Sequence, residues 1–216
     1  MGAAAILLLL PLTAAAQPAE LQPATQLSEH RAADVVEFLT GSAIGLGMHE
    51  SGHLLFDGIF AAQPDLHAVH LGPFPFFAIG HRSDLSPRRE FTVSSAGFWV
   101  QEATNEWLLT RQWGGRPLKD AHAPLAKGIF AFNVLNSVGY AAVAFAKAGP
   151  PERDTRGMAD SIRVDERAIA ALVLVPAILD AIRFFNPDQR WPRWTSRATK
   201  TSAVLLVLKR TSSSRR

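Results

Sequence analysis

Residues 45–57 read GLGMHESGHLLFD and contain an H-E-x-x-H motif, formed by His49, Glu50 and His53. On a helix, side chains four positions apart lie on one face, so both histidines can point at one metal ion. Glu50 follows His49 directly, and its carboxylate is placed to act as a general base on a metal-bound water. The motif therefore predicts a metal site on a helix, with Glu50 as the base.

The chemistry of the motif favours zinc. The chain has no cysteine, which excludes a thiolate site, and imidazole is a good zinc ligand. A catalytic zinc ion takes three protein ligands and a water, so a third ligand must come from elsewhere in the chain. The apolar, Gly-rich flanks predict that the motif is buried, and buried ionisable groups are costly unless they are paired or bind a metal. This setting disfavours the alternative of an ordinary helix with two hydrogen-bonded histidines.

The composition predicts one domain associated with a membrane. The chain has 216 residues, of which 48% are hydrophobic and only 19% are charged. The net charge is +3, and many of the basic residues lie in the C-terminal part of the chain. A basic tail of this kind favours contact with a membrane surface or solvent, and no pattern of alternating aromatic and basic residues indicates nucleic-acid binding.

The first 16 residues are an apolar run followed by alanines. This pattern predicts a signal peptide cut after Ala16, with an uncleaved N-terminal membrane helix as the alternative. Residues 17–32 are polar and contain proline, which predicts a linker. In either case the chain is directed to a membrane or across it.

Residues 33–62 predict one long helix that carries the motif. A membrane span needs about 20 mostly apolar residues, and this stretch is long enough although several ionisable residues interrupt it. Gly41, Gly45 and Gly52 give it small faces for close helix packing. Asp57, four residues after His53, either hydrogen-bonds that imidazole or marks the end of the helix.

The next segments predict a β-hairpin and a second helix. Residues 66–71 and 74–80 are short, β-branched or aromatic runs, which favours paired strands. On a strand, His67 and His70 point to opposite faces, so we expect surface residues there and not ligands. Residues 90–110 predict a helix, on which Glu102 and Glu106 are rival candidates for the third metal ligand.

Two further apolar helices are predicted at residues 127–147 and 166–185. Each is long enough to span a membrane. Asn133 and Asn136 lie inside the first of them, and they serve either helix packing or substrate binding. Asp180 lies inside the second as a carboxylate of unknown purpose.

These elements predict a mainly α-helical fold. We expect a polytopic membrane bundle of about four helices, with a short β-hairpin after the HExxH helix. The membrane-embedded domain comprises residues 33–185, the charged stretch 148–165 is a loop, and residues 186–216 form a basic tail whose end is disordered. The expected location is a membrane, as an integral multi-pass protein of a bacterial inner membrane.

The order of elements resembles the site-2-protease-like intramembrane zinc metalloproteases. The resemblance begins at the HESGH helix and continues through residues 67–80, where that family carries a β-hairpin. It then reaches Ser94-Ser95-Ala96-Gly97, at the place where the family has Ala-Gly-Pro followed by an asparagine; here Phe98 and Gln101 stand instead. The helix with Asn133 is similar to the family's later Asn-containing helix. The similarity covers roughly residues 41–160.

The resemblance implies a third zinc ligand and a reaction. The family uses an aspartate, often in Leu-Asp-Gly or Asn-Pro-Asp-Gly, and neither motif occurs in this chain. Asp154 follows the Asn-containing helix and is the first candidate, with Asp160 second. The implied activity is hydrolysis of a peptide or membrane protein near or within the bilayer, with Glu50 moving the proton and the β-hairpin pairing with an extended substrate.

Two other functions fit the same residues. One is a secreted, soluble HExxH zinc peptidase that uses Glu102 or Glu106 as its third ligand. The other is a non-catalytic membrane protein that keeps a metalloprotease-like fold for binding.

Overall fold

The computed structural model describes residues 23–71, 74–81, 84–189, 194–198 and 204–208. The predicted signal segment 1–16 and the end of the tail, predicted to be disordered, lie outside these ranges. The described residues form five helices and four strands. Their bounds are α1 Pro23–Phe60, β1 Asp65–Leu71, β2 Phe74–Gly80, α2 Pro87–Thr110, α3 Pro124–Ala146, α4 Asp154–Ile162, α5 Glu166–Phe185, β3 Trp194–Ala198 and β4 Val204–Leu208.

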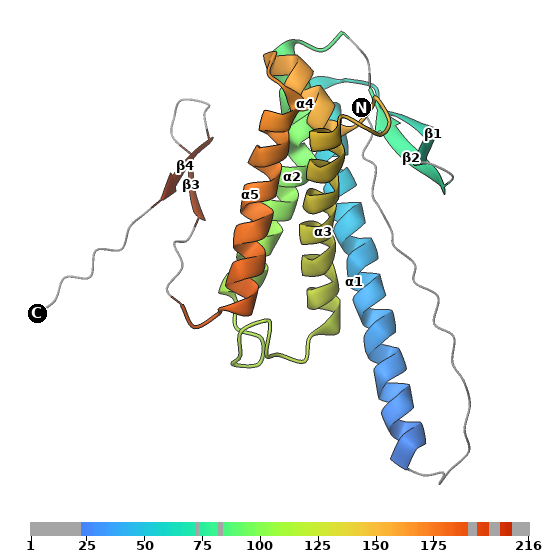
Figure 1. Ribbon diagram of the computed structural model, residues 1–216, viewed down its shortest axis with the longest axis vertical. Coiled ribbons are helices and arrows are strands. Elements are labelled where there is room, and N and C mark those ends of the chain that lie inside the picture. The colour runs from blue at the N-terminus through green and yellow to red at the C-terminus, as the bar shows by residue number, and fades with distance from the viewer. Residues whose placement is uncertain (1–22, 72–73, 82–83, 190–193, 199–203, 209–216) are drawn as a thin grey trace, which may run out of the picture.

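Four long helices lie side by side, and the short helix α4 lies at one end of them, at the same end as the β1–β2 hairpin (Figure 1). Helix α1 packs against α2 and α3, α3 packs against α5, and α4 packs against α2 and α5. The N-terminal part of α1 projects past the other helices (Figure 1). The prediction of a mainly α-helical fold with a β-hairpin after the HExxH helix is confirmed.

The starts of three helices follow from their sequences. Helices α2 and α3 begin at Pro87 and Pro124, where a proline has no hydrogen bond to lose and its fixed φ suits the first turn. Helix α5 follows Asp165, whose side chain accepts a hydrogen bond from the backbone N–H of Arg167. The bounds of α5 coincide with the predicted helix at residues 166–185.

Glycines allow α1 and α3 to touch along their backbones. A Cβ atom on Gly41 would overlap the carbonyl oxygen of Leu125, and one on Gly128 would overlap that of Phe38. The side chain of Ser42 donates a hydrogen bond to the carbonyl oxygen of Gly128 at 3.2 Å across the same contact. The predicted small face of the HExxH helix is therefore a helix-packing surface.

The core at the α4 end combines residues from four helices. An apolar cluster there joins α2, α3, α4 and α5, and its buried members are Phe98, Tyr140, Met158, Ala159, Ile169 and Val173. A second cluster at the opposite end joins α2, the connection after it and α3, with Leu108, Leu118, Ala126, Ile129 and Phe130 buried. The first cluster packs directly against the HExxH motif, because Phe98 and Tyr140 both contact the ring of His49.

The hairpin has the predicted strands and antiparallel pairing. In its register, Leu66 pairs with Ile79 and His67 pairs with Ala78. Ile79 and Ala78 are buried, whereas Leu66 is exposed. His67 lies 3.9 Å from the exposed carboxylate of Asp65 and takes no part in a metal-ligand group.

Two predictions about connecting segments need correction. The stretch 148–165 is not a loop throughout, because it contains helix α4, whose inner side buries Thr155, Met158 and Ala159. The predicted linker 17–32 is helical from Pro23 onward. The tail contains two antiparallel strands, β3 and β4. Charged and proline residues suggested irregular structure in the first two segments, but burial of one face stabilises α4 and a helix-compatible proline begins α1.

Among the described residues, two helices are long and apolar enough to cross a membrane, α3 and α5. Both α1 and α2 are longer, but ionisable side chains interrupt them. About four membrane-spanning helices were predicted, and two of the described helices have the length and apolar composition that a span requires.

Candidate metal centre

His49 and His53 lie one turn apart on α1 and face the interior of the bundle. Their exposed fractions are 0% and 1%. Their Nε2 atoms are 3.3 Å apart, and their rings meet edge to face with centroids 5.0 Å apart. The i, i+4 spacing of the motif therefore brings two imidazole nitrogens to one point, as the sequence predicts.

Asp154 completes the group from the first residue of α4. Its Oδ2 atom lies 3.2 Å from Nε2 of His49 and 3.4 Å from Nε2 of His53, and its side chain is fully buried. His49, His53 and Asp154 thus form a buried group that could hold a metal ion. The prediction of Asp154 as the third member agrees with this geometry. Asp160, the second candidate, is exposed and pairs with Arg156 at 3.5 Å.

A backbone carbonyl orients His53. Its Nδ1 atom lies 2.8 Å from the carbonyl oxygen of Val93 on α2. A carbonyl can only accept, so Nδ1 carries a proton and Nε2 faces the group; in the neutral form of His53, which is the form that binds a metal, the lone pair of Nε2 points into it. Asp57 was one predicted partner of His53, but it does not make this bond. Asp57 lies one turn before α1 ends at Phe60, and its buried carboxylate is 3.7 Å from Nδ1 of His81.

The ring of His49 is enclosed by α2 and α3. Gly97 lies against it, so closely that a Cβ atom at that position would overlap the imidazole. Phe98 meets the ring edge to face at 5.4 Å, and Tyr140 stacks on it at 5.9 Å. These contacts surround the imidazole of His49 on the sides away from His53 and Asp154.

The charge of Asp154 is set by the two histidines. Burial alone would raise the pKa of this carboxyl group. In the metal-free protein, the positive charge of protonated His53 and hydrogen bonds with His49 and His53 act in the other direction and leave the pKa of Asp154 below its ordinary value. The carboxylate is therefore ionised, which is the form that binds a metal ion.

Glu50 lies beside the group as a buried carboxylate. Its exposed fraction is 7%, and neither of its oxygen atoms has a hydrogen-bond partner among the described residues. A buried carboxylate without an internal partner is costly, and such a group is often kept for function. Glu50 is not one of the three converging residues.

The rival ligands Glu102 and Glu106 do not join the group. Oε2 of Glu106 lies 2.8 Å from the guanidinium of Arg183 on α5, and Asp180 lies 3.0 Å from the same guanidinium. Glu106 therefore belongs to an ion-pair network with α5. Asp180, whose purpose the sequence does not indicate, belongs to that network.

Asn133 connects helices. Its Nδ2 atom donates a hydrogen bond to Oδ1 of Asn105 at 2.9 Å and a longer one to the carbonyl oxygen of Gln101 at 3.4 Å. Of the two predicted roles, this contact favours helix packing for Asn133. Asn136 is buried on the same helix, one turn nearer the C-terminus.

Sequence reasoning missed several residues that shape the group. The carbonyl of Val93 is a backbone atom, so no pattern of side chains indicates it. Gly97 stood out only as a small residue, and its contact with His49 depends on how α1 and α2 pack. Arg153 and Glu166 form a buried ion pair beside Asp154, with side chains 5% and 9% exposed. In the sequence, only the position of Arg153 directly before Asp154 indicated that such an ion pair could form.

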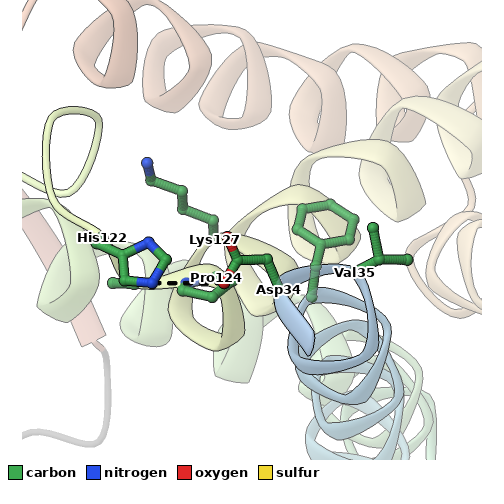
Figure 2. A pocket seen from close by; sticks show the side chains of 7 residues that line it. Asp34, Val35, His122, Pro124 and Lys127 are labelled. Atoms are coloured by element: carbon green, nitrogen blue, oxygen red, sulfur yellow. Dashed lines mark ion pairs between the residues drawn. The ribbon is translucent and has the colours of Figure 1, made fainter. Parts of the chain in front are cut away.

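A shallow cavity of roughly 330 Å³ lies elsewhere on the chain, between the N-terminal half of α1 and the start of α3 (Figure 2). His122 and Lys127 line it, together with Asp34, which is 3.4 Å from Nε2 of His122. His122 is 80% exposed at its side chain. Asp34 and His49 are 15 positions apart on one helix, or about 20 Å, so this cavity is separate from the metal centre.

Searches of protein-family models, curated proteins and solved structures found no match to this chain. The resemblance to site-2-protease-like metalloproteases therefore rests on the residues and their order.

Proposed function

We propose that the chain is a zinc-dependent membrane endopeptidase of the site-2-protease-like kind, which hydrolyses peptide bonds near or within the bilayer. The observation that carries this proposal is the triangle formed by the Nε2 atoms of His49 and His53 and Oδ2 of Asp154. Its edges are 3.2, 3.3 and 3.4 Å.

The size of this triangle fits zinc. A tetrahedral zinc ion with bonds of about 2.0–2.1 Å separates its ligand atoms by about 3.3–3.4 Å. Two imidazoles and one carboxylate are also a donor set of catalytic zinc sites, which keep a fourth position for water or substrate. The absence of cysteine leaves His and carboxylate as the chain's strong zinc ligands.

The chemistry follows from the residues around the ligands. A zinc ion held there supplies Lewis acidity and an activated water for attack on a peptide carbonyl. Glu50, buried and without a hydrogen-bond partner in the described part of the chain, accepts the proton of the attacking water and delivers it to the leaving amine. The pairing of Glu106 with Arg183 disfavours the alternative of a soluble peptidase with a glutamate as third ligand.

The surface of the bundle supports a membrane location. Helices α3 and α5 are long and apolar enough to cross a bilayer. Large apolar side chains are also exposed along α1 and α5; they include Val36, Leu39, Leu55 and Ile59 on α1 and Leu172, Val175, Ile178 and Phe185 on α5. Exposed apolar surface of this extent is unfavourable in water and favourable in lipid. The metal centre then lies among helices that contact acyl chains.

The hairpin supports a peptide substrate. Strand β1 begins five residues after α1 ends, so the hairpin follows closely on the helix that carries the motif. Its two strands pair with each other, and in the part of the chain that the structure describes neither pairs with a third. An extended peptide can add to such an edge through backbone hydrogen bonds.

The test is zinc content combined with peptide hydrolysis, measured on the detergent-extracted full chain. We expect about one zinc ion per chain in the wild type, loss of zinc in His53→Ala and Asp154→Asn, and cleavage of an unstructured membrane-protein substrate only when zinc is bound. Zinc binding without any cleavage, across a panel of such substrates, would instead favour the non-catalytic function. A wild type that binds no zinc would contradict the peptidase proposal and would also favour the non-catalytic function.

A further inference from the structure

Both sequence neighbours of Asp154 are held by one buried carboxylate, that of Glu166 at the first position of α5. Arg153 donates from Nε to Oε1 of Glu166 at 2.6 Å and from Nη2 to Oε2. Thr155 donates from Oγ1 to the same Oε1 at 2.8 Å. The exposed fractions of Arg153, Thr155 and Glu166 are 4%, 0% and 8%.

This arrangement restrains the start of α4 from several directions. The guanidinium of Arg153 binds the carboxylate through two nitrogens, which fixes its orientation as well as its distance. Its third nitrogen, Nη1, donates to the carbonyl oxygen of Pro150 at 2.9 Å, so the incoming loop is held as well. The residues before and after Asp154 are thereby tied to α5.

Stability alone is a weak reason for such a group. A buried ion pair must be desolvated, and apolar residues of similar volume often stabilise a fold equally well. Helix α4 has only nine residues and is too short to be rigid without support. A metal ligand, however, must be placed to within a few tenths of an ångström, and it needs neighbours that hold it there.

We propose that Glu166 is a positioning residue of the metal centre, which places the third ligand Asp154 by binding Arg153 and Thr155 on either side of it. The inference rests on the proposed metal centre and adds a residue from α5, a helix that provides no ligand. It also gives a support for an aspartate ligand outside Leu-Asp-Gly and Asn-Pro-Asp-Gly, since a carboxylate at the start of the next helix holds both neighbours of this one.

The experiment measures zinc affinity of the full chain in detergent, by competition with a chromophoric chelator. The variants are Glu166→Gln, which removes the charge, and Thr155→Val, which removes one hydrogen bond at nearly constant volume. The matched control is Asp165→Asn, because Asp165 is the adjacent carboxylate but is exposed and binds Lys147 at 2.7 Å. We expect both test variants to bind zinc about 10- to 100-fold more weakly, the range typical of groups that support ligands, and the control to bind it like the wild type.

Cobalt substitution separates positioning from a general loss of stability. The visible absorption of Co²⁺ reports the geometry of its ligands. We expect the spectra of cobalt-loaded Thr155→Val and Glu166→Gln to differ from that of the cobalt-loaded wild type. A merely structural role would lower the melting temperature of the metal-free protein and leave the loaded spectrum unchanged. If Glu166→Gln does not fold, Thr155→Val decides.

Two outcomes would overturn the proposal and can be told apart. Wild-type affinity and spectrum in both test variants, with zinc still lost in Asp154→Asn, would refute the role of Glu166 and leave the metal centre intact. A wild type that binds no metal would refute the centre and this inference together.

Discussion

Gly97 lies directly against the imidazole of His49, and no side chain larger than a hydrogen atom fits between α2 and that ring. The contact joins the small-residue run of α2 to the first histidine of the motif. It makes the position of a metal ligand depend on how closely two helices pack.

Replacement of Gly97 by alanine tests this dependence. The added methyl group must displace the ring of His49 or separate α1 from α2, and we expect overpacking to lower stability by about 1–3 kcal/mol. Zinc affinity should fall by at least about tenfold because the ligand moves. Chelator competition and thermal unfolding measure the two effects. The control is Gly47→Ala on α1, where an added Cβ meets no atom within 4 Å; equal zinc binding by the two variants would contradict the prediction.

Glu50→Gln should separate metal binding from catalysis. The amide keeps the shape of the side chain but cannot accept the proton of the attacking water, so we expect peptide hydrolysis to fall by at least about 100-fold. Zinc content should match that of the wild type, since Glu50 is outside the three converging residues. Loss of zinc in Glu50→Gln would show that the carboxylate is a ligand and would overturn the assignment.

Asp154→Asn should lower zinc affinity far more than Glu102→Gln or Glu106→Gln. Asp154 is fully buried between the histidines, while Glu106 is bound to Arg183. We expect a loss of more than about 100-fold for Asp154→Asn, above the range for groups that only support a ligand. The two glutamine variants serve as controls for the loss of a partly buried carboxyl group, and the reverse ranking would favour a soluble-peptidase arrangement.

The contact between α1 and α3 can be tested independently of the metal. Gly41→Ala and Gly128→Ala each place a methyl group onto a backbone carbonyl of the facing helix, which cannot move aside as a side chain can. We expect each variant to lose about 1–3 kcal/mol or more in reversible unfolding by a denaturing detergent. In Gly47→Ala the same substitution should be neutral or stabilising by up to about 1 kcal/mol. Unchanged stability in both contact variants would show that the helices are farther apart.

Much of the fold was predictable because its elements carry local signals. The strands of the hairpin are short aromatic and β-branched runs, and α5 is a mostly apolar run that follows a capping aspartate. Helix α4 has no such signal. Its exposed Arg156 and Asp160 resemble a charged loop, and its apolar side is recognisable only once Met158 and Ala159 have neighbours to pack against.

The candidate site divides in the same way. His49, Glu50 and His53 could be predicted because the H-E-x-x-H motif lies within five consecutive residues of one helix. Asp154 lies 105 residues after His49, and the resemblance to a family, not periodicity, singled it out. Glu166 itself carried no distinctive signal, since an acidic residue in the first turn of a helix is common for electrostatic reasons alone.

The ligands of the candidate centre come from the first helix and from the fourth, and this separation has a consequence for folding. An ion bound to His49, His53 and Asp154 is a cross-link that closes a loop of 105 residues. A covalent link across a loop of that length reduces the entropy of the unfolded chain by an amount worth about 5 kcal/mol. A bound metal ion would therefore stabilise the folded protein by linking α1 to α4. The loaded protein would then unfold as one cooperative unit.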